Sequence, residues 1–313
     1  MKVGLLTYHH TTNYGATLQA YALMKVIKSQ GHEVEFIDYH PYRLGIAYLK
    51  HLYLNKCFRY RYFIDNTIKL WKMRRFVRSH MSLSPQKFYT SSSLHRANLN
   101  YDLVICGSDE IWELEKTIES IPLGKNLCLS YLLDFIDNSR TRKASYAASC
   151  GATKTFGDYR EKISQLLQDF DAISVRDANS LRLLREEYGI QATKVVDPTF
   201  LANFTELIPS RPIAKRYILV YGSLLQEEEN YVKAVADAEG LEIISLGYPC
   251  SVANTNSIDI GPEEWLGYYS QASYIFTSFY HGIIFSIIFR KPFTAFIRSL
   301  KGDDKSSKVN DLL

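Results

Sequence analysis

The opening of the chain constrains the fold more than any other part of it. Val3 to Thr7 is a short apolar run, and apolar residues then recur at helical spacing from Ala16 to Ile27. Gly31 follows where a helix would end, and Val34 to Tyr39 alternates as a strand does. A strand, a helix and a second strand in this order predict a parallel sheet with helices packed on it.

The same alternation of strand and helix patterns continues along the chain. Further strands are predicted at Asp102–Cys106, Lys143–Ala147, Ala172–Val175, 194–196, Tyr217–Tyr221, Glu242–Leu246, 274–277 and Phe293–Phe296. Helices are predicted at 158–169, 177–188, 226–240, 262–272 and 281–290. The pattern is typical of an α/β fold.

The division into domains follows from one irregular segment. Residues 203–215 contain Pro209 and Pro212 and show no periodicity, as a linker does. The chain has 313 residues, and a domain has roughly 150, so two domains are expected. We therefore predict an N-terminal α/β domain over 1–204 and a C-terminal one over 205–313. Two facing domains would form a cleft at the carboxyl ends of their strands.

Residues 45–82 do not follow the pattern and are predicted to be a helical, basic and aromatic insertion that covers the site. Its basic residues are Arg59, Arg61, Lys69, Lys72, Arg74, Arg75 and Arg78. Such a run could attract phosphates or attach the chain peripherally to an anionic membrane surface. A solvated helix face is the more ordinary explanation, and it is the one that we favour from the sequence.

Composition excludes several classes of function. The net charge of +4 is too small to indicate nucleic-acid binding. The five cysteines are widely spaced without a Cys-x-x-Cys pair, which predicts a reduced cytoplasmic chain without a disulfide framework. No cluster of metal ligands is visible in the sequence, so no metal is predicted. The uncharged stretch Leu266–Phe289 is broken by glycine and polar residues, unlike a membrane span.

Two polar segments follow predicted strands of the first domain. Asn13 and Gly15 lie in a polar turn that opens a helix, where free N–H groups could bind an anion. An N-cap with close packing at Gly15 is an equally good explanation. Gly107, Ser108 and Asp109 follow the strand that ends at Cys106, so Asp109 could act as a general base or hydroxyl ligand. Local pattern alone slightly favours a helix cap there.

Two further segments carry an arginine and a histidine at strand ends. Arg176 ends a buried strand, where its charge needs a partner. A phosphate or carboxylate ligand and a structural pair with Asp177 or Asp197 are equally good candidates. His281 opens an apolar helix just after Ser278, a geometry that suits a phosphate and a proton donor. A histidine next to an apolar run is more often part of a satisfied core.

Together these segments resemble the polysaccharide pyruvyl transferase family. The matching segments run in family order along nearly the whole chain and are Asn13–Leu23, Gly107–Trp112, Ser145–Gly151, Ser174–Asp177, Val196–Thr199, Ser278–Gly282 and Lys291–Phe293. The resemblance implies two Rossmann-like domains facing a cleft, similar to the GT-B-type glycosyltransferases. The chain also departs from the family pattern. Glu110 stands where the common form has Gln. Relatives usually continue past the position of Leu313 into a further helix, so a truncated second domain and a naturally short one are both open from the sequence.

The resemblance also implies an activity. Such an enzyme transfers pyruvate from phosphoenolpyruvate onto two hydroxyls of a sugar and forms a cyclic ketal, in surface or capsular polysaccharide biosynthesis. Phosphoenolpyruvate is then the donor substrate, and no cofactor is needed. The acceptor is a sugar, free or lipid-linked, and a lipid-linked acceptor would place the enzyme at the inner face of the membrane.

By the same resemblance, residues receive roles. Arg176 would hold the donor phosphate or carboxylate, His281 would donate a proton or bind phosphate, and Asp109 would act as a base or hydroxyl ligand. The expected substrate-binding residues are Asn13, Tyr14, Gly15, Gly107, Ser108, Ser278 and Gly282.

Two alternatives remain. A nucleotide-sugar glycosyltransferase on the same architecture would bind UDP or GDP tightly, because fold does not fix function. A non-catalytic glycan-binding or assembly protein would bind sugars without turnover.

Overall fold

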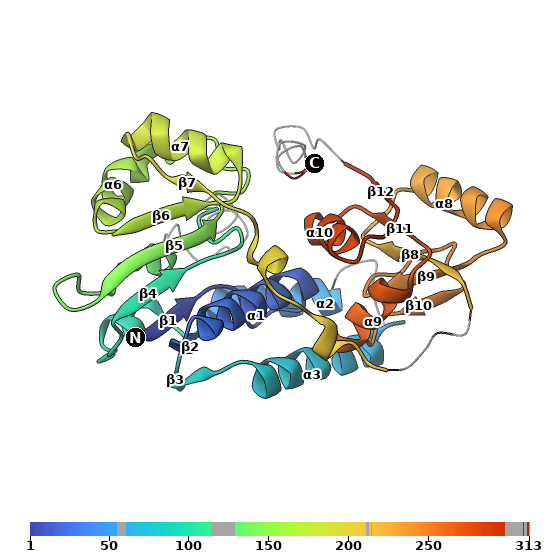
Figure 1. Ribbon diagram of the computed structural model, residues 1–313, viewed down its shortest axis with the longest axis horizontal. Coiled ribbons are helices and arrows are strands. Elements are labelled where there is room, and N and C mark those ends of the chain that lie inside the picture. Colours follow the sequence, from blue (N-terminus) through green and yellow to red (C-terminus); the bar gives the residue numbers. More distant parts are fainter. Residues whose placement is uncertain are drawn as a thin grey trace.

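The protein consists of two parallel sheets, each with helices packed on it (Figure 1). The computed structural model describes residues 1–54, 61–113, 129–210, 213, 215–297, 309 and 312. The strands of the first sheet lie within residues 2–194 and those of the second within residues 217–295, so the predicted α/β class is confirmed.

Over the described residues, the first sheet has seven strands in the order β3-β2-β1-β4-β5-β6-β7. They are β1 Lys2–Leu6, β2 Glu33–Tyr39, β3 Leu83–Phe88, β4 Leu103–Cys106, β5 Arg142–Ala148, β6 Ala172–Val175 and β7 Thr193–Lys194. All neighbours pair in parallel. The strand order reverses between β1 and β4, which is where ligands bind in Rossmann-like sheets.

The second sheet has five strands in the order β10-β9-β8-β11-β12 within the same described ranges. They are β8 Tyr217–Tyr221, β9 Glu242–Leu246, β10 Thr255–Ser257, β11 Tyr274–Thr277 and β12 Phe293–Ala295. Their pairing is also parallel, and the order reverses between β8 and β11. Each sheet therefore has its own topological switch point.

The helices that the structure describes are α1 Tyr14–Ser29, α2 Tyr42–Leu54, α3 Phe63–His80, α4 Ser91–His95, α6 Arg160–Gln168, α7 Ala178–Tyr188, α8 Gln226–Glu239, α9 Pro262–Gln271 and α10 Tyr280–Ile288. Figure 1 shows α6 and α7 at one edge of the first sheet and α8 at the far side of the second. Helix α1 lies in the middle of the molecule, and α3 runs below it towards α9. Among the described residues, no helix combines the length and apolarity needed to cross a bilayer.

One hydrophobic core joins the two sheets. It includes Leu18 of α1, Phe76 of α3, Leu219 of β8 and Trp265 of α9, all fully buried. Tyr14 of α1 stacks on Trp265 with ring centroids 5.6 Å apart. Because apolar burial contributes roughly 25 cal/mol per Å², this shared core holds the two units in one packed body.

Most predicted elements are confirmed to within a few residues. The short helix α4 was not predicted, and two missed strands share a cause. The edge strands β3 and β10 were not predicted, because β3 has exposed polar residues at its centre and β10 reads Thr-Asn-Ser. An edge strand is less covered than a central one and does not need apolar residues throughout. Its sequence therefore lacks the apolar pattern by which strands are recognised. The predicted linker also contains a short 3-10 turn, Thr205–Leu207, and its Leu207 is anchored in the core.

The predicted insertion is helical and consists of α2 and α3, but the expected solvated face is only partly correct. Lys69 is almost completely buried. Lys72 forms an ion pair with Glu264 of α9 at 2.8 Å. Arg74 and Arg78 line a pocket. Arg59 lies outside the described residues. The basic face of α3 is therefore used in packing against the second sheet and in forming a cavity.

Candidate functional site

The two switch points carry the polar motifs that the sequence singled out. At the end of β1, Thr7 Oγ1 donates a hydrogen bond to the carbonyl of Ser108, which follows β4, at 2.9 Å. At the end of β8, the carbonyl of Ser223 accepts from Ser278 Oγ, which follows β11, at 3.2 Å. Each hydrogen bond joins the two strand ends between which the strand order reverses. The site is therefore built where an α/β fold places its ligands.

Arg176 is the centre of this site. Its Nη1 donates to Asp197 Oδ2 at 2.7 Å and to Ser108 Oγ at 3.3 Å, and its Nη2 donates to Asp109 Oδ1 at 3.1 Å. Burial opposes its charge, but the carboxylates of Asp109 and Asp197 outweigh that effect and raise the pKa of Arg176. Among the described residues, its buried Nε–H has no acceptor. The Nε–H of Arg176 is therefore a buried donor that is available to a ligand.

Asp197 is fully buried beneath the arginine. Its Oδ1 accepts from the backbone N–H and the Oγ1 of Thr199, at 3.1 and 2.7 Å. Burial alone would raise the pKa of Asp197, but His281, Arg176 and the Thr199 hydroxyl together hold it well below its usual range. Asp197 is thus a permanent carboxylate that fixes the guanidinium and faces the histidine.

Asp109 is the accessible acid of the pair. Its side chain is 15% exposed, whereas that of Asp197 is 0% exposed. Its backbone has a φ of 76°, in the left-handed region, and its Oδ1 also accepts from the N–H of Glu110 at 2.9 Å. The preceding Gly107 has a φ of +114°, and a Cβ there would lie 2.2 Å from the Tyr146 carbonyl. The turn after β4 therefore presents Asp109 in a fixed place.

The second domain contributes the first turn of α10. The Nε2 of His281 lies 3.6 Å from Asp197 Oδ2. The guanidinium carbon of Arg176 lies 4.8 Å from the centre of the Tyr280 ring, within cation–π range. Residues from both sheets therefore meet around Arg176, and the predicted cleft between the domains is closed at this point by direct contacts.

Glycines make the approach of α10 possible. A Cβ on Gly15 of α1 would lie 2.2 Å from Cγ of His281, and one on Gly282 would lie 2.0 Å from Oγ1 of Thr277. Both contacts are too close for any side chain. Gly15 therefore makes room for the histidine, and Gly282 lets α10 pack against the end of β11.

The two helix starts differ in a way that affects anion binding. Asn13 caps α1, since its Oδ1 accepts from the N–H groups of Gly15 and Ala16 at 3.0 and 3.3 Å. The cap, not a free anion site, is therefore what the structure shows at α1. In the described part of the chain, no side chain caps α10, whose N-cap residue is Phe279. The start of α10 retains the free N–H groups and the positive dipole end.

Tyr14, which was expected to bind substrate, packs against Trp265 of the second domain. It is fully buried, and its hydroxyl donates to the carbonyl of Ile260 at 3.0 Å. Two other residues that the resemblance assigned to substrate binding, Ser108 and Ser278, form hydrogen bonds at the switch points, with Thr7 and Ser223 respectively. The structure thus places Tyr14 in the interdomain core.

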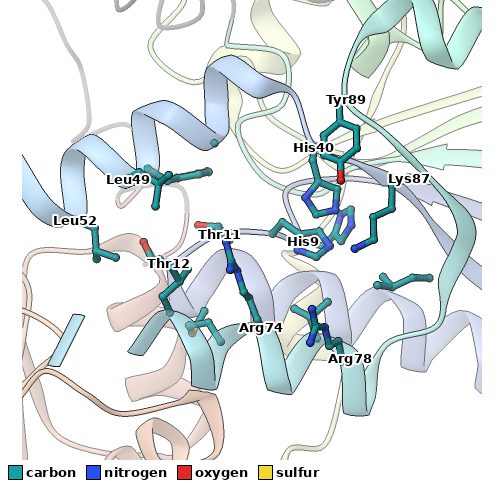
Figure 2. A pocket seen from close by; sticks show the side chains of 17 residues that line it. His9, Thr11, Thr12, His40, Leu49, Leu52, Arg74, Arg78, Lys87 and Tyr89 are labelled. Atoms are coloured by element: carbon teal, nitrogen blue, oxygen red, sulfur yellow. The ribbon is translucent and has the colours of Figure 1, made fainter. Parts of the chain in front are cut away.

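A pocket of about 360 Å³ adjoins this cluster and is lined by α2, α3 and the loops after β1 and β2. Figure 2 shows Arg74 and Arg78 of α3 on one side, with Lys87 and Tyr89 opposite. Tyr48 also lines the pocket, and burial together with the nearby charge of Asp109 raises its pKa to about 12, despite a hydrogen bond with Thr11. The pocket is therefore basic and partly aromatic.

The same pocket wall holds a group of potential metal ligands. His9, His10, His40 and Asp38 each offer one ligand atom, and these atoms all lie within 4.8 Å of one another. The expectation that the chain has no cluster of metal ligands is therefore wrong. The sequence did not show it, because Asp38 lies in β2 and His40 just after it, whereas His9 and His10 follow β1. Only the parallel pairing of those strands brings the four residues together.

Sequence analysis identified most of the polar cluster, including Arg176 at its centre, and missed one aromatic member. Ser108, Asp109, Arg176 and His281 are brought together as expected. Of the two acids considered for Arg176, Asp197 is a partner, while Asp177 caps α7 by accepting from the N–H of Ser180 at 2.8 Å. Tyr280 was missed. Its position next to the histidine at a helix start was the available signal.

Comparison with known proteins agrees with this architecture. The family model for polysaccharide pyruvyl transferase matches residues 13–299. No curated protein matches the chain. A Listeria monocytogenes protein assigned as a UDP-N-acetylglucosamine 2-epimerase has a TM-score of 0.56 at 9% identity, covering 99% of this chain and 81% of that one. The S. aureus MnaA–UDP structure has a TM-score of 0.50 at 11% identity, covering 96% and 80%.

At such low identity these two structures support the fold alone. The fold is the GT-B type, with two Rossmann-like sheets facing one site. The family match spans both sheets and includes every residue of the polar cluster around Arg176. The chain therefore belongs to the polysaccharide pyruvyl transferase family.

Proposed function

We propose that this protein transfers pyruvate from phosphoenolpyruvate onto two hydroxyls of a sugar and releases phosphate. The observation that carries the proposal is the buried Arg176, whose Nε–H has no acceptor among the described residues and which lies beside the uncapped start of α10. A guanidinium and a helix N-terminus together recognise an anion such as phosphate or carboxylate. Phosphoenolpyruvate carries both groups.

The proposed reaction replaces the phosphate on C2 of phosphoenolpyruvate with two sugar oxygens. A proton adds to C3 of phosphoenolpyruvate while a sugar hydroxyl oxygen bonds to C2 and loses its own proton. The C2–O bond to phosphate then breaks, and the second hydroxyl bonds to C2 and releases a proton. The products are the ketal, which carries a methyl group, and inorganic phosphate. The reaction needs an acid, a base and positive charge near the phosphate.

The two carboxylates of the site suit different tasks. Asp109 is partly exposed and lies just after β4 beside Arg176, so its side chain is placed to accept a hydroxyl proton. Asp197 is buried, and its Oδ2 lies 3.6 Å from Nε2 of His281, so it can orient the imidazole for proton transfer to the substrate. We therefore assign the base to Asp109 and the acid to His281, with Arg176 and the start of α10 holding the phosphate.

The neighbouring pocket suits a sugar acceptor. Tyr48 and Tyr89 offer ring faces and hydroxyls, and Arg74, Arg78 and Lys87 offer positive charge. Cations of this kind would bind the phosphates of a lipid-linked sugar. The exposed Trp71, Phe63 and Ile64 of α3 could then contact the lipid surface.

The test begins with ligand-dependent stability. Phosphoenolpyruvate, inorganic phosphate, UDP and GDP are added separately to the full chain, and Tm is measured. A ligand at about 100 times its Kd stabilises a fold by about 2.7 kcal/mol. Stabilisation by phosphoenolpyruvate beyond phosphate, lost in Arg176→Ala, is expected. Stabilisation by a nucleotide alone would replace this proposal with glycosyl transfer.

The reaction itself is tested in D₂O. An acceptor library is incubated with protein and phosphoenolpyruvate, and products are read by mass spectrometry and NMR. Protonation at C3 requires one deuterium in the ketal methyl group. His281→Ala and Asp109→Asn should abolish the product while leaving the circular dichroism spectrum unchanged. Phosphate release without a ketal, or full activity of both variants, would contradict the assignment. A sugar bound without any turnover would favour a glycan-binding protein.

For the lipid-linked form of the acceptor, the protein is floated with anionic vesicles. Binding that Trp71→Ser weakens is expected, and equal binding by both proteins would argue against attachment through α3.

A further inference from the structure

Four side chains converge on one point beside the pocket. His9 and His10 follow β1, and Asp38 and His40 lie at and just after the end of β2. The Nε2 atoms of His9, His10 and His40 lie 3.2, 2.8 and 2.5 Å from a single atom, Oδ1 of Asp38. Figure 2 shows His9 and His40 on this wall of the pocket.

The hydrogen atoms of this cluster do not balance unless a positive charge, either an extra proton on His9 or a metal ion, lies within it. His9 Nδ1 lies 3.0 Å from the carbonyl oxygen of Thr7, which can only accept, so Nδ1 carries a proton. In neutral His9 the Nε2 then presents a lone pair to the carboxylate oxygen of Asp38. Two acceptors facing each other in a buried place repel. A positive ion between them would convert this repulsion into attraction.

The second oxygen of Asp38 points to the same conclusion. Asp38 is 1% exposed, and its Oδ2 has no hydrogen-bond partner among the described residues. Buried carboxylate oxygens normally have partners. The hydrogen bond from His9 Nδ1 to a backbone carbonyl is also the outer contact that orients metal-bound histidines.

The donor set specifies the type of ion. Three imidazole nitrogens and one carboxylate oxygen suit Zn²⁺ and related transition metals, whereas Mg²⁺ and Ca²⁺ prefer oxygen ligands. Tetrahedral ligands about 2.0–2.1 Å from zinc lie roughly 3.3 Å apart. The three Nε2 atoms need to move only slightly away from Asp38 Oδ1, and ligand atoms as far as 4.8 Å apart need to approach one another.

We propose that His9, His10, His40 and Asp38 form a Zn²⁺ site. It would tie the loop before α1 to the loop before α2 and so fix one wall of the pocket. The proposal stands on its own and does not depend on pyruvyl transfer. No step of the reaction above uses this ion.

The test uses the full chain without a histidine tag, stripped with a chelator and then given Co²⁺ or Zn²⁺. Metal content is measured after gel filtration, and Co²⁺ is followed by its visible absorption, which reports four-coordinate nitrogen and oxygen ligands. One ion per chain is expected, with Zn²⁺ but not Mg²⁺ raising Tm. His10 and His40 have side chains about one fifth exposed, at 20% and 22%, so their substitution leaves the core intact.

His10→Ala and His40→Ala should each weaken Co²⁺ binding by more than about 100-fold, beyond the usual loss of an outer contact. His32→Ala, which changes a histidine away from the cluster, is the matched control and should bind as the parent protein does. His40→Gln tests the ligand role with a similar shape. A parent chain that binds no Co²⁺, or ligand variants that bind as well as His32→Ala, would overturn the proposal.

Discussion

The imidazole of His281 occupies the space that a side chain on Gly15 would fill. A Cβ built on Gly15 lies 2.2 Å from Cγ and 2.4 Å from Nδ1 of that ring. Gly15 belongs to the first turn of α1 and His281 to the first turn of α10, so this contact fixes how one domain meets the other. A single missing side chain thus sets the position of the histidine relative to Asp197.

Gly15→Ala should displace His281 and abolish turnover. Overpacking of this kind also costs about 1–3 kcal/mol of stability. Gly45→Ala is the matched control, because Gly45 lies within α2 and an added Cβ meets nothing within 4 Å. Replacing a helical glycine with alanine should stabilise the fold by roughly 0.5–1 kcal/mol. Denaturant unfolding and a turnover assay measure both effects, and an active, equally stable Gly15→Ala protein would contradict the packing argument.

Arg176 and Asp197 should be coupled in stability but not in activity. Arg176→Met leaves Asp197 buried without its cation, which typically costs about 3–5 kcal/mol. Arg176→Met/Asp197→Asn removes both charges and should recover much of that loss, while activity stays absent because the anion site is gone. Urea unfolding of the single and double variants gives the coupling energy. If the double variant were no more stable than Arg176→Met, Asp197 would not be the main partner of Arg176.

Asn13 should prove to be a helix cap in stability measurements. Asn13→Ala removes the acceptor for the N–H groups of Gly15 and Ala16 and should cost about 1 kcal/mol. Asn13→Asp keeps an equivalent cap and should keep the stability. Equal stability of the Ala and Asp variants would exclude the capping role. The KM for phosphoenolpyruvate in Asn13→Asp separately reports any substrate contact at this position.

Lys69 should make stability depend on pH. Burial lowers its pKa to about 7, while the unfolded chain retains a value of about 10.4. Below pH 7 both states bind the proton, and the folded state carries the full cost of the buried charge, on the order of 4 kcal/mol. Between pH 7 and about 10 only the unfolded state is protonated, so stability rises with pH.

Lys69→Met removes this ionisable group. The variant should be more stable than the parent at pH 6, and the difference should shrink as the pH approaches 10. Urea unfolding across this range measures the effect. Lys25→Met, at a side chain 43% exposed, is the control and should change the pH profile little. A difference between parent and Lys69→Met that stays constant with pH would show that Lys69 titrates normally.

The sequence by itself determined the order of the secondary structure and the sheet class. Strands such as Ala172–Val175 and Tyr217–Tyr221 were predicted at their observed bounds, because buried parallel strands are short apolar runs between turn residues. It also indicated the polar ends of those strands, since ligands in α/β sheets gather there. Local periodicity carries this information, and no long-range contact is needed to use it.

Tertiary structure alone decided which polar ends meet. Two acids were candidate partners of Arg176. The folded chain places Asp197 Oδ2 2.7 Å from its Nη1, whereas Asp177 caps α7. His9 and His10 face Asp38 only because β1 and β2 pair side by side in parallel. Side chains 28 residues apart have no sequence signal for contact. Distances across strands and domains are set by the whole core, and that is the physical reason why they cannot be inferred locally.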